Sequence, residues 1–222
     1  MSLPSAIRAL ATVNIMGNKI GNAHLSKLQE IMKAHPTLVS LCGIADDATE
    51  ANLSGLWMNC DDAVVLADEL PAKRALTRLD ISNNNQLFSA AVGSALASAL
   101  QVTCLRELDL SRGSVSPANA RAFVKEFAVC LRVNGVLETL RMRDNCFKGA
   151  EAGAALGDAI AVNTVLNELD LSGGKIPAQR CDDEFIETFS VSLAGSQSRS
   201  KQSRNRIWWI ISSNKTQTFR RR

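Results

Sequence analysis

The sequence LRELDLS at residues 105–111 returns almost unchanged as LNELDLS at residues 166–172. In both segments leucine stands at the first, fourth and sixth positions, so the last two leucines lie on the same side of an extended chain. The residues between them are polar, and the opposite side of the strand is therefore expected to be polar. Each segment predicts a short strand with one apolar side.

The same apolar spacing recurs along most of the chain. With apolar substitutions, the pattern L-x-x-L-x-L-x-x-N-x-L begins at residues 10, 38, 48, 76, 105, 137 and 166. The successive starts are 28, 10, 28, 29, 32 and 29 residues apart. A sustained period of this length indicates stacked repeats, in which each copy buries its apolar side against its neighbours.

Helical periodicity follows the predicted strands. Residues 89–100 are rich in alanine, and residues 117–133 carry apolar side chains on one stripe behind a Ser116-Pro117 start. Residues 149–162 have a similar apolar stripe. Each of these segments predicts a helix after a strand.

The region between residues 38 and 76 is less regular. Asp61-Asp62 predicts the start of a helix, because acidic side chains are favourable at the positive end of the helix dipole, and Pro71 follows its predicted end. The ten-residue step from Leu38 to Ala48 is too short to include a helix. We expect two strands joined by a bare loop there.

The turn after each strand is predicted to hold asparagine or glycine. Asn18, Asn84 and Asn145 fill this position in three copies, where a buried side-chain amide can satisfy backbone groups that face inward. Gly113 and Gly174 replace asparagine in two others, where glycine allows a tighter turn with positive φ. The alternation suggests two alternating kinds of repeat.

The repeat length, the strand–helix unit and the LRELDLS and LNELDLS segments resemble the ribonuclease-inhibitor-like leucine-rich repeats. The resemblance covers about residues 10–195 and implies an α/β fold, a right-handed β/α leucine-rich-repeat solenoid (horseshoe) with a parallel concave sheet and outer helices. It also implies binding of another protein on the concave sheet rather than an enzyme activity. We assign residues 1–195 to the repeat domain and residues 196–222 to a basic linker with a degenerate capping strand or tail.

The polar strand positions are the candidate binding residues. Asp80, Asp109, Arg141 and Asp170 are expected to form a row across the sheet, because neighbouring strands lie about 4.8 Å apart. Two interpretations of this row stay open: a lateral salt-bridge ladder of little energetic weight, or a mixed-charge face that sets the register and specificity of a partner. The predicted partner-binding residues are Arg78, Asp80, Arg106, Asp109, Arg112, Arg141, Arg143, Glu168 and Asp170.

No catalytic, phosphate-binding or metal-binding motif stands out in the sequence. His24 and His35 are the only histidines, and both are expected to be surface or turn residues. The six cysteines are widely spaced and form no C-x-x-C pair, so free thiols are expected. We predict no catalytic residue, no cofactor and no metal.

Charge divides the chain unequally. The net charge is +3, but residues 1–195 carry 17 basic and 22 acidic side chains, whereas residues 196–222 carry eight basic and no acidic ones. A degenerate copy of the repeat from Arg206 to Thr216, with Trp209 at a leucine position, predicts an added strand at the end of the sheet. The alternative is that this basic tail binds nucleic acid or an anionic membrane.

The expected function is an intracellular protein–protein interaction scaffold. The N-terminal residues lack the basic start and apolar core of a secretory signal, so a cytoplasmic location is expected. A GTPase-activating protein resembling the regulator of Ran is an alternative suggested by the family, although no residue motif carries it over.

Overall fold

A computed structural model describes residues 10–173, 178, 180–197 and 208–209 of the chain. Within these residues the architecture is α/β, and six strands form one all-parallel sheet in sequence order from β1 to β6. The strands are β1 (Glu50–Asn52), β2 (Arg78–Asp80), β3 (Glu107–Asp109), β4 (Thr139–Arg141), β5 (Glu168–Asp170) and β6 (Trp208–Trp209). The helices are α1 (Asn22–Ala34), α2 (Cys60–Glu69), the short 3-10 helix η2 (Leu70–Ala72), α3 (Ala90–Leu100), α4 (Pro117–Leu131), α5 (Ala150–Val162) and α6 (Asp183–Gln197).

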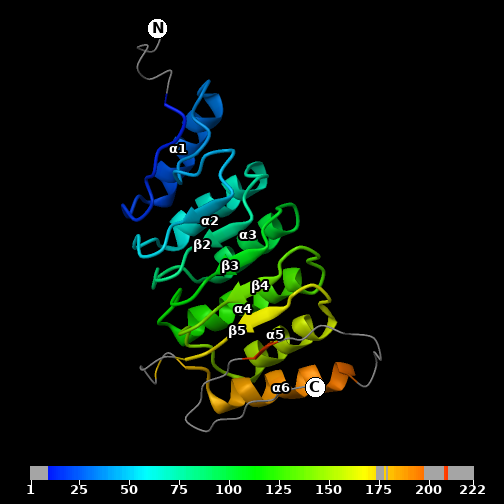
Figure 1. Cartoon of the computed structure of the whole chain (residues 1–222). Helices are drawn as coiled ribbons and strands as arrows, with labels where there is room; N and C mark the ends of the chain where they lie inside the picture. The colour runs from blue at the N-terminus through cyan, green and yellow to red at the C-terminus, as the bar shows by residue number, and fades with distance from the viewer. Residues whose placement is uncertain (1–9, 174–177, 179, 198–207, 210–222) are drawn as a thin grey trace.

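Strands and helices alternate along the chain, and Figure 1 shows the resulting units stacked from α1 at one end to α6 at the other. The strand register confirms the spacing read from the sequence, because Leu79 pairs with Leu108 and Leu108 with Leu140. The last strand follows the same rule, since Trp209 pairs with Leu169 as the degenerate copy predicts. Equivalent positions of the repeat therefore lie side by side on neighbouring strands.

The middle residue of each strand from β2 to β5 is a fully buried leucine. These residues are Leu79, Leu108, Leu140 and Leu169. Each contributes roughly 1.5–3 kcal/mol when it is fully removed from water. Because successive side chains of a strand point to opposite sides, the residues that flank each leucine project away from this core.

Phenylalanines extend the core into the helical layer. The rings of Phe88 and Phe123 stack with centroids 3.9 Å apart, and Phe147 lies between Phe88 and Phe185 at centroid distances of 6.2 and 5.7 Å. Gly153 permits the close approach of α5 and α6, since a Cβ atom here would lie 2.2 Å from the carbonyl oxygen of Phe185. The core thus runs from unit to unit and is not confined to one repeat.

Helices α2 to α5 begin within one residue of the starts that the sequence predicts, whereas α1 and α6 were not predicted. The Ser89 side chain accepts a hydrogen bond from the backbone N–H of Val92 at the start of α3, and Ser116 caps α4 in the same way. At the start of α2, Asn59 and Asp62 cap each other's backbone N–H groups. Such caps satisfy donors that a helix leaves unpaired in its first turn.

Two of the three predicted turn asparagines have the expected role. The Asn145 Oδ1 atom accepts hydrogen bonds from the N–H groups of Gly113 and Ser114, and its amide donates to the carbonyl of Leu110. Asn84 bonds in the same way to the preceding unit. The prediction for Asn18 is wrong, because this side chain is exposed and, among the described residues, bonds only to the carbonyl of Ile15 in its own turn. The structure describes no earlier unit toward which Asn18 could turn.

The reason predicted for Gly113 is also wrong. Its φ is not positive; the left-handed residue is Arg112, one position earlier, with a φ of 55°. Gly113 is needed for space, since a Cβ atom there would lie 2.5 Å from the ring of Phe88. The second predicted turn glycine, Gly174, lies outside the described residues.

The N-terminal part is less regular than the rest. Its first two predicted strands appear only as isolated bridges, between Thr12 and Ser40 and between Asn14 and Cys42. Residues 38–49 contain no helix, which confirms the bare loop expected from the ten-residue step. The continuous sheet begins at β1.

Candidate interaction surface on the sheet

The sheet has a buried apolar side and a charged side. The charged side chains that flank the buried leucines, with those directly beside the strands, form a surface that we call the charged sheet face. Its members are Glu50, Arg78, Asp80, Arg106, Glu107, Asp109, Glu138, Arg141, Arg143, Glu168 and Asp170. Because seven are acidic and four are arginines, the face has an excess of negative charge.

Five of these side chains form a continuous chain of ion pairs across the strands. The guanidinium of Arg78 lies 3.3 Å from a carboxylate oxygen of Glu50 and 3.2 Å from one of Glu107. Arg141 joins Glu107 to Glu168, at 3.5 and 3.3 Å. The result is an alternating row of glutamate and arginine from β1 to β5.

Arg141 enters this row diagonally. The residue of β4 in register with Glu107 and Glu168 is Thr139, which carries no charge. Arg141 stands two residues further along β4, and its long side chain reaches the two glutamates. The strand register confirms the predicted row, because Arg141 lies between Asp109 and Asp170 on neighbouring strands. A salt-bridge ladder along this row is not what forms, since Arg141 pairs with the two glutamates and not with these aspartates.

Hydrogen bonding within the row shifts the pKa values of Glu107 and Arg78. The hydrogen bond from Arg78 is the largest cause that holds the pKa of Glu107 below its usual value, burial opposes this shift, and Arg141 reinforces it. The same hydrogen bond with Glu107 is the largest cause that raises the pKa of Arg78. Glu107 is therefore the central acceptor of the row, contacted by an arginine from each neighbouring strand.

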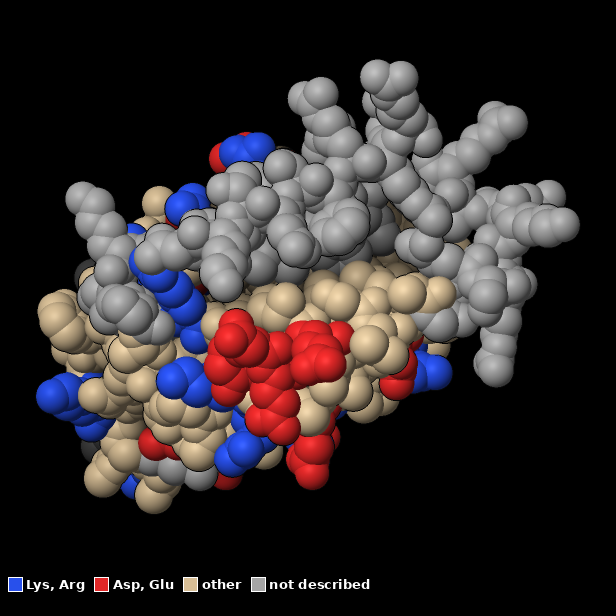
Figure 2. Space-filling view, turned by 90° about the horizontal axis from the view of Figure 1, so that it is seen from below, with Lys and Arg blue, Asp and Glu red and all other residues tan. Residues whose placement is uncertain are grey.

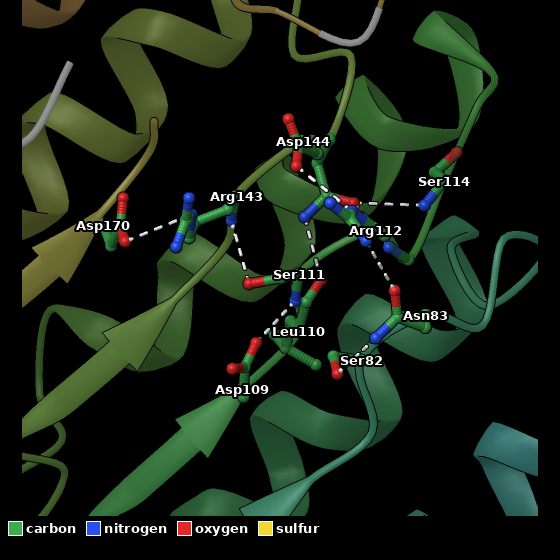
Figure 3. A network of polar contacts seen from close by, with 12 residues as sticks. Ser82, Asn83, Asp109, Leu110, Ser111, Arg112, Ser114, Arg143, Asp144 and Asp170 are labelled. Carbon is green, nitrogen blue, oxygen red and sulfur yellow. Dashed lines mark hydrogen bonds and ion pairs between the residues drawn. The ribbon is translucent and has the colours of Figure 1, made fainter. Parts of the chain in front are cut away.

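The other two arginines of the face are also paired. Arg106 contacts the carboxylate of Glu138, and the Nε atom of Arg143 lies 3.5 Å from Oδ2 of Asp170. The backbone N–H of Arg143 also donates to the hydroxyl of Ser111 on the neighbouring unit, as Figure 3 shows. All four arginines are thus held by acids of adjacent strands.

Asp80 and Asp109 are bonded differently. One oxygen of each carboxylate accepts a 2.9 Å hydrogen bond from a backbone N–H two residues later, that of Ser82 or Ser111. Both aspartates also line a hollow of about 200 Å³ on the charged sheet face. The complete lining is Arg78, Leu79, Asp80, Glu107, Asp109 and Arg141.

A second polar ladder lies in the turns that follow the strands. Asn83, Arg112 and Asp144 occupy one position in successive units, and all three have positive φ, between 54° and 59°. The guanidinium of Arg112 lies 3.2 Å from the side-chain oxygens of both Asn83 and Asp144 (Figure 3). The backbone N–H of Arg112 donates to the carbonyl of Arg143, 2.8 Å away in the next unit. This bond helps to offset the roughly 1–3 kcal/mol that such a conformation costs.

The nine predicted binding residues therefore fall into three groups. Four line the hollow, namely Arg78, Asp80, Asp109 and Arg141. Four more lie on the same face around it, namely Arg106, Arg143, Glu168 and Asp170. Arg112 lies apart from them, in the turn ladder.

Three acids of the face were missing from the predicted set: Glu50, Glu107 and Glu138. The sequence pattern could have identified them, because each occupies a polar position in or beside a strand at the repeat spacing. Aligning the copies from residues 48, 76 and 105 would have put Glu50, Arg78 and Glu107 in one row.

Other kinds of site have little support among the described residues. No group of three or more histidine, cysteine, aspartate or glutamate side chains there could hold a metal ion. All six cysteines are free, as expected, and burial raises the pKa of the Cys130 thiol to about 11. His35 is a turn residue, as predicted, since its Nδ1 atom accepts from the N–H groups of Thr37 and Leu38. No described helix is long and apolar enough to cross a membrane.

The last helix gives one end of the stack an acidic surface. Asp183, Glu184 and Glu187 of α6 are exposed, and Figure 2, which views this end, shows acidic side chains gathered together. Of the predicted tail at residues 196–222, the structure describes Ser196 and Gln197, which end α6, and Trp208 and Trp209 of β6. The last helix therefore continues two residues beyond the predicted boundary of the repeat domain. Binding of nucleic acid or of an anionic membrane by the basic tail stays a prediction.

A scan against models of known protein families gives no match, and a search of curated proteins finds no significantly similar sequence.

Proposed function

We propose that this protein is a leucine-rich-repeat solenoid of the ribonuclease-inhibitor-like class, and that it binds another protein through its charged sheet face. The repeat spacing, the parallel sheet in sequence order and the strand–helix alternation support the fold assignment. Stacks of this kind bury only the side that faces the helices, so the other side of the sheet stays available to a partner.

The observation that carries the proposal is the ordered charge of the sheet face. Each arginine is held between or beside acids of adjacent strands, so both signs of charge have defined positions before any partner arrives. Preorganised charges reduce the side-chain ordering needed on binding, and their pattern selects a complementary partner. The ion pairs themselves contribute little to stability because they are exposed. Recognition is the better explanation for them.

Quantitative affinity capture with the full chain tests this proposal. Arg141→Glu reverses the charge that joins Glu107 to Glu168, and should reduce recovery of the partner at least tenfold. Lys125→Glu on α4 is the matched control: Lys125 is also an exposed cation paired with a glutamate, Glu151, but it lies on the helical layer. It should leave recovery unchanged.

Circular dichroism and the unfolding midpoint of both variants establish that the fold is retained. Equal capture by the wild type and Arg141→Glu, with both folded, would show that the sheet face is not the binding surface. Loss with Lys125→Glu alone would point to the helical layer instead. GTPase activation and binding through the basic tail remain the alternative predictions from the sequence.

A further inference from the structure

Asp80 and Asp109 are the exceptions on the charged sheet face. In the described part of the chain, the other nine members of the face all take part in an ion pair, whereas neither of these aspartates does. Each uses one carboxylate oxygen for its own turn, and no hydrogen bond to the second oxygen occurs among the described residues. Seven acids and four arginines leave three excess negative charges on the face; one belongs to the row of three glutamates and two arginines, and the other two lie at Asp80 and Asp109.

The two aspartates are also direct neighbours. Asp80 of β2 pairs in register with Asp109 of β3, so their backbones lie about 4.8 Å apart. Like charges placed opposite each other on adjacent strands are unfavourable. Arg78 and Arg141 line the same hollow, but both are bonded to Glu107 and neither forms an ion pair with these aspartates.

The hollow above these aspartates limits what can occupy it. Its volume of about 200 Å³ is below the roughly 300–1,000 Å³ that is typical of small-molecule pockets. It has room for the end of one long side chain. A guanidinium or ammonium group there would lie against both aspartates that line the hollow, and hydrogen bonds between charged groups are about twice as strong as neutral ones.

We propose that the hollow between Asp80 and Asp109 receives a single arginine or lysine side chain of the partner protein. The proposal rests on the proposed function and specifies the chemistry of the contact. A cation in this position lies beside two carboxylates that the folded chain leaves without an ion pair, and offsets one of their two negative charges. Arginine suits the position better than lysine, since its planar group can bond two carboxylates at once.

A titration of the ¹⁵N-labelled full chain with Nα-acetyl-arginine amide, followed by NMR, tests the contact without the partner. The amide signals of Asp80, Asp109, Ser82 and Ser111 should shift with saturation, because the N–H groups of the two serines bond to the aspartate carboxylates. Nα-acetyl-citrulline amide has nearly the same shape without the charge. It should produce at least tenfold weaker binding.

The variant Asp80→Asn/Asp109→Asn is suited to this experiment because asparagine already stands at the equivalent position of β1. Asn52 of β1 makes the same turn bond to the N–H of Ser54, at 2.9 Å, so asparagine preserves the local structure. The double variant should lose at least tenfold in affinity for the arginine probe. Glu151→Gln, on the helical layer, should bind the probe like the wild type.

The proposal is overturned by equal binding of the citrulline probe, by unchanged binding of the arginine probe to the double variant, or by shifts as large at Asp183 and Glu184 of α6 as at the hollow. Occupation of the hollow by an arginine or lysine of residues 199–222 would exclude a partner side chain. In that case the probe leaves Asp80 and Asp109 unshifted, and the double variant alters the signals of that segment.

Partner capture that depends on Arg141 while the probe fails to bind would contradict this inference and leave the proposed function standing.

Discussion

Two junctions between neighbouring repeats are built from different interactions. Between the units that start at residues 105 and 137, the ladder from β3 to β4 is continuous and Asn145 bonds to the preceding turn. Between the units that start at residues 38 and 48, no strand ladder joins the described residues. There the carboxylate of Glu69 accepts 2.7 Å hydrogen bonds from the backbone N–H of Leu41 and the hydroxyl of Ser40.

Lys73 completes this polar junction. Its ammonium group lies 3.0 Å from the carbonyl of Val39 and 2.7 Å from a carboxylate oxygen of Asp46, and the lysine side chain is 0% exposed. Glu69 ends α2, where the helix dipole disfavours a carboxylate, so its bonds to the N-terminal unit explain its position. Where ten residues leave no room for a helix, buried charged side chains supply the hydrogen bonds that a strand ladder supplies elsewhere.

Removal of an aromatic ring from the regular stack should have the largest effect. Phe123→Ala deletes the ring that stacks on both Phe88 and Phe127, and should lower the free energy of unfolding by about 3–5 kcal/mol in urea denaturation. The matched control on the same helix is Val129→Ala, a 61% exposed residue that should change it by less than about 0.5 kcal/mol. Similar values for the two variants would mean that the phenylalanine stack is not part of the cooperative core.

Loss of a turn asparagine should lower the free energy of unfolding much more in the regular stack than at the N-terminal end. Asn145→Ala leaves two buried N–H groups and one carbonyl without their partner, and should cost about 3 kcal/mol of unfolding free energy. Asn18→Ala removes an exposed asparagine at the same repeat position, and should cost less than about 0.5 kcal/mol. Equal losses would contradict the difference in burial on which this comparison depends.

Removal of the Glu69 carboxylate from the polar junction should destabilise only the N-terminal unit. Glu69→Ala leaves the N–H of Leu41 without its acceptor, at a cost of about 1–3 kcal/mol that is confined to the N-terminal unit. Hydrogen exchange should accelerate at Val13 and Leu41 and stay unchanged at Leu108. Glu69→Gln retains one oxygen acceptor and should have a smaller effect. Equal acceleration at Leu108 would show that the junction is coupled to the whole stack.

The smallest effect is expected on the charged sheet face. The folded-state pKa of Glu107 lies below its usual value of 4.5, so its carboxylate stabilises the fold above this pH and loses that contribution as the pH falls through the folded-state pKa. Glu107→Gln should therefore lower the melting temperature slightly at pH 7, and the difference from the wild type should shrink below pH 4.5. A difference that grows in acid would contradict the assigned direction of the pKa shift.

Much of the sheet could be predicted because its register depends only on counting. Parallel strands joined by units of 28–32 residues place equivalent leucines opposite each other. Trp209 takes the equivalent place opposite Leu169, although it follows 40 residues later. The individual ion pairs could not be predicted in this way. Arg141 meets Glu107 and Glu168 because Thr139 leaves a gap in their row, and only the length and direction of the arginine side chain reveal that.

The same limit explains the errors at the turns. Asn18 and Asn145 occupy the same position of the repeat, but an amide is useful only where a preceding unit brings backbone groups to it. The sequence pattern predicts that Gly113 meets a local requirement of the backbone, whereas the need comes from the Phe88 ring of the preceding unit. Local patterns cannot show what a neighbouring unit places against a residue.

The sequence by itself determined the strand–helix unit, its period, the order of the strands and the set of polar positions that line the sheet. These follow from apolar periodicity, which is a property of consecutive residues. Only the tertiary structure decided which charges pair, which carboxylates stay without an ion pair, and how Glu69 and Lys73 join the N-terminal unit to the stack. These outcomes depend on distances between side chains that are ten or more residues apart in the chain, and such distances are set only when the units pack.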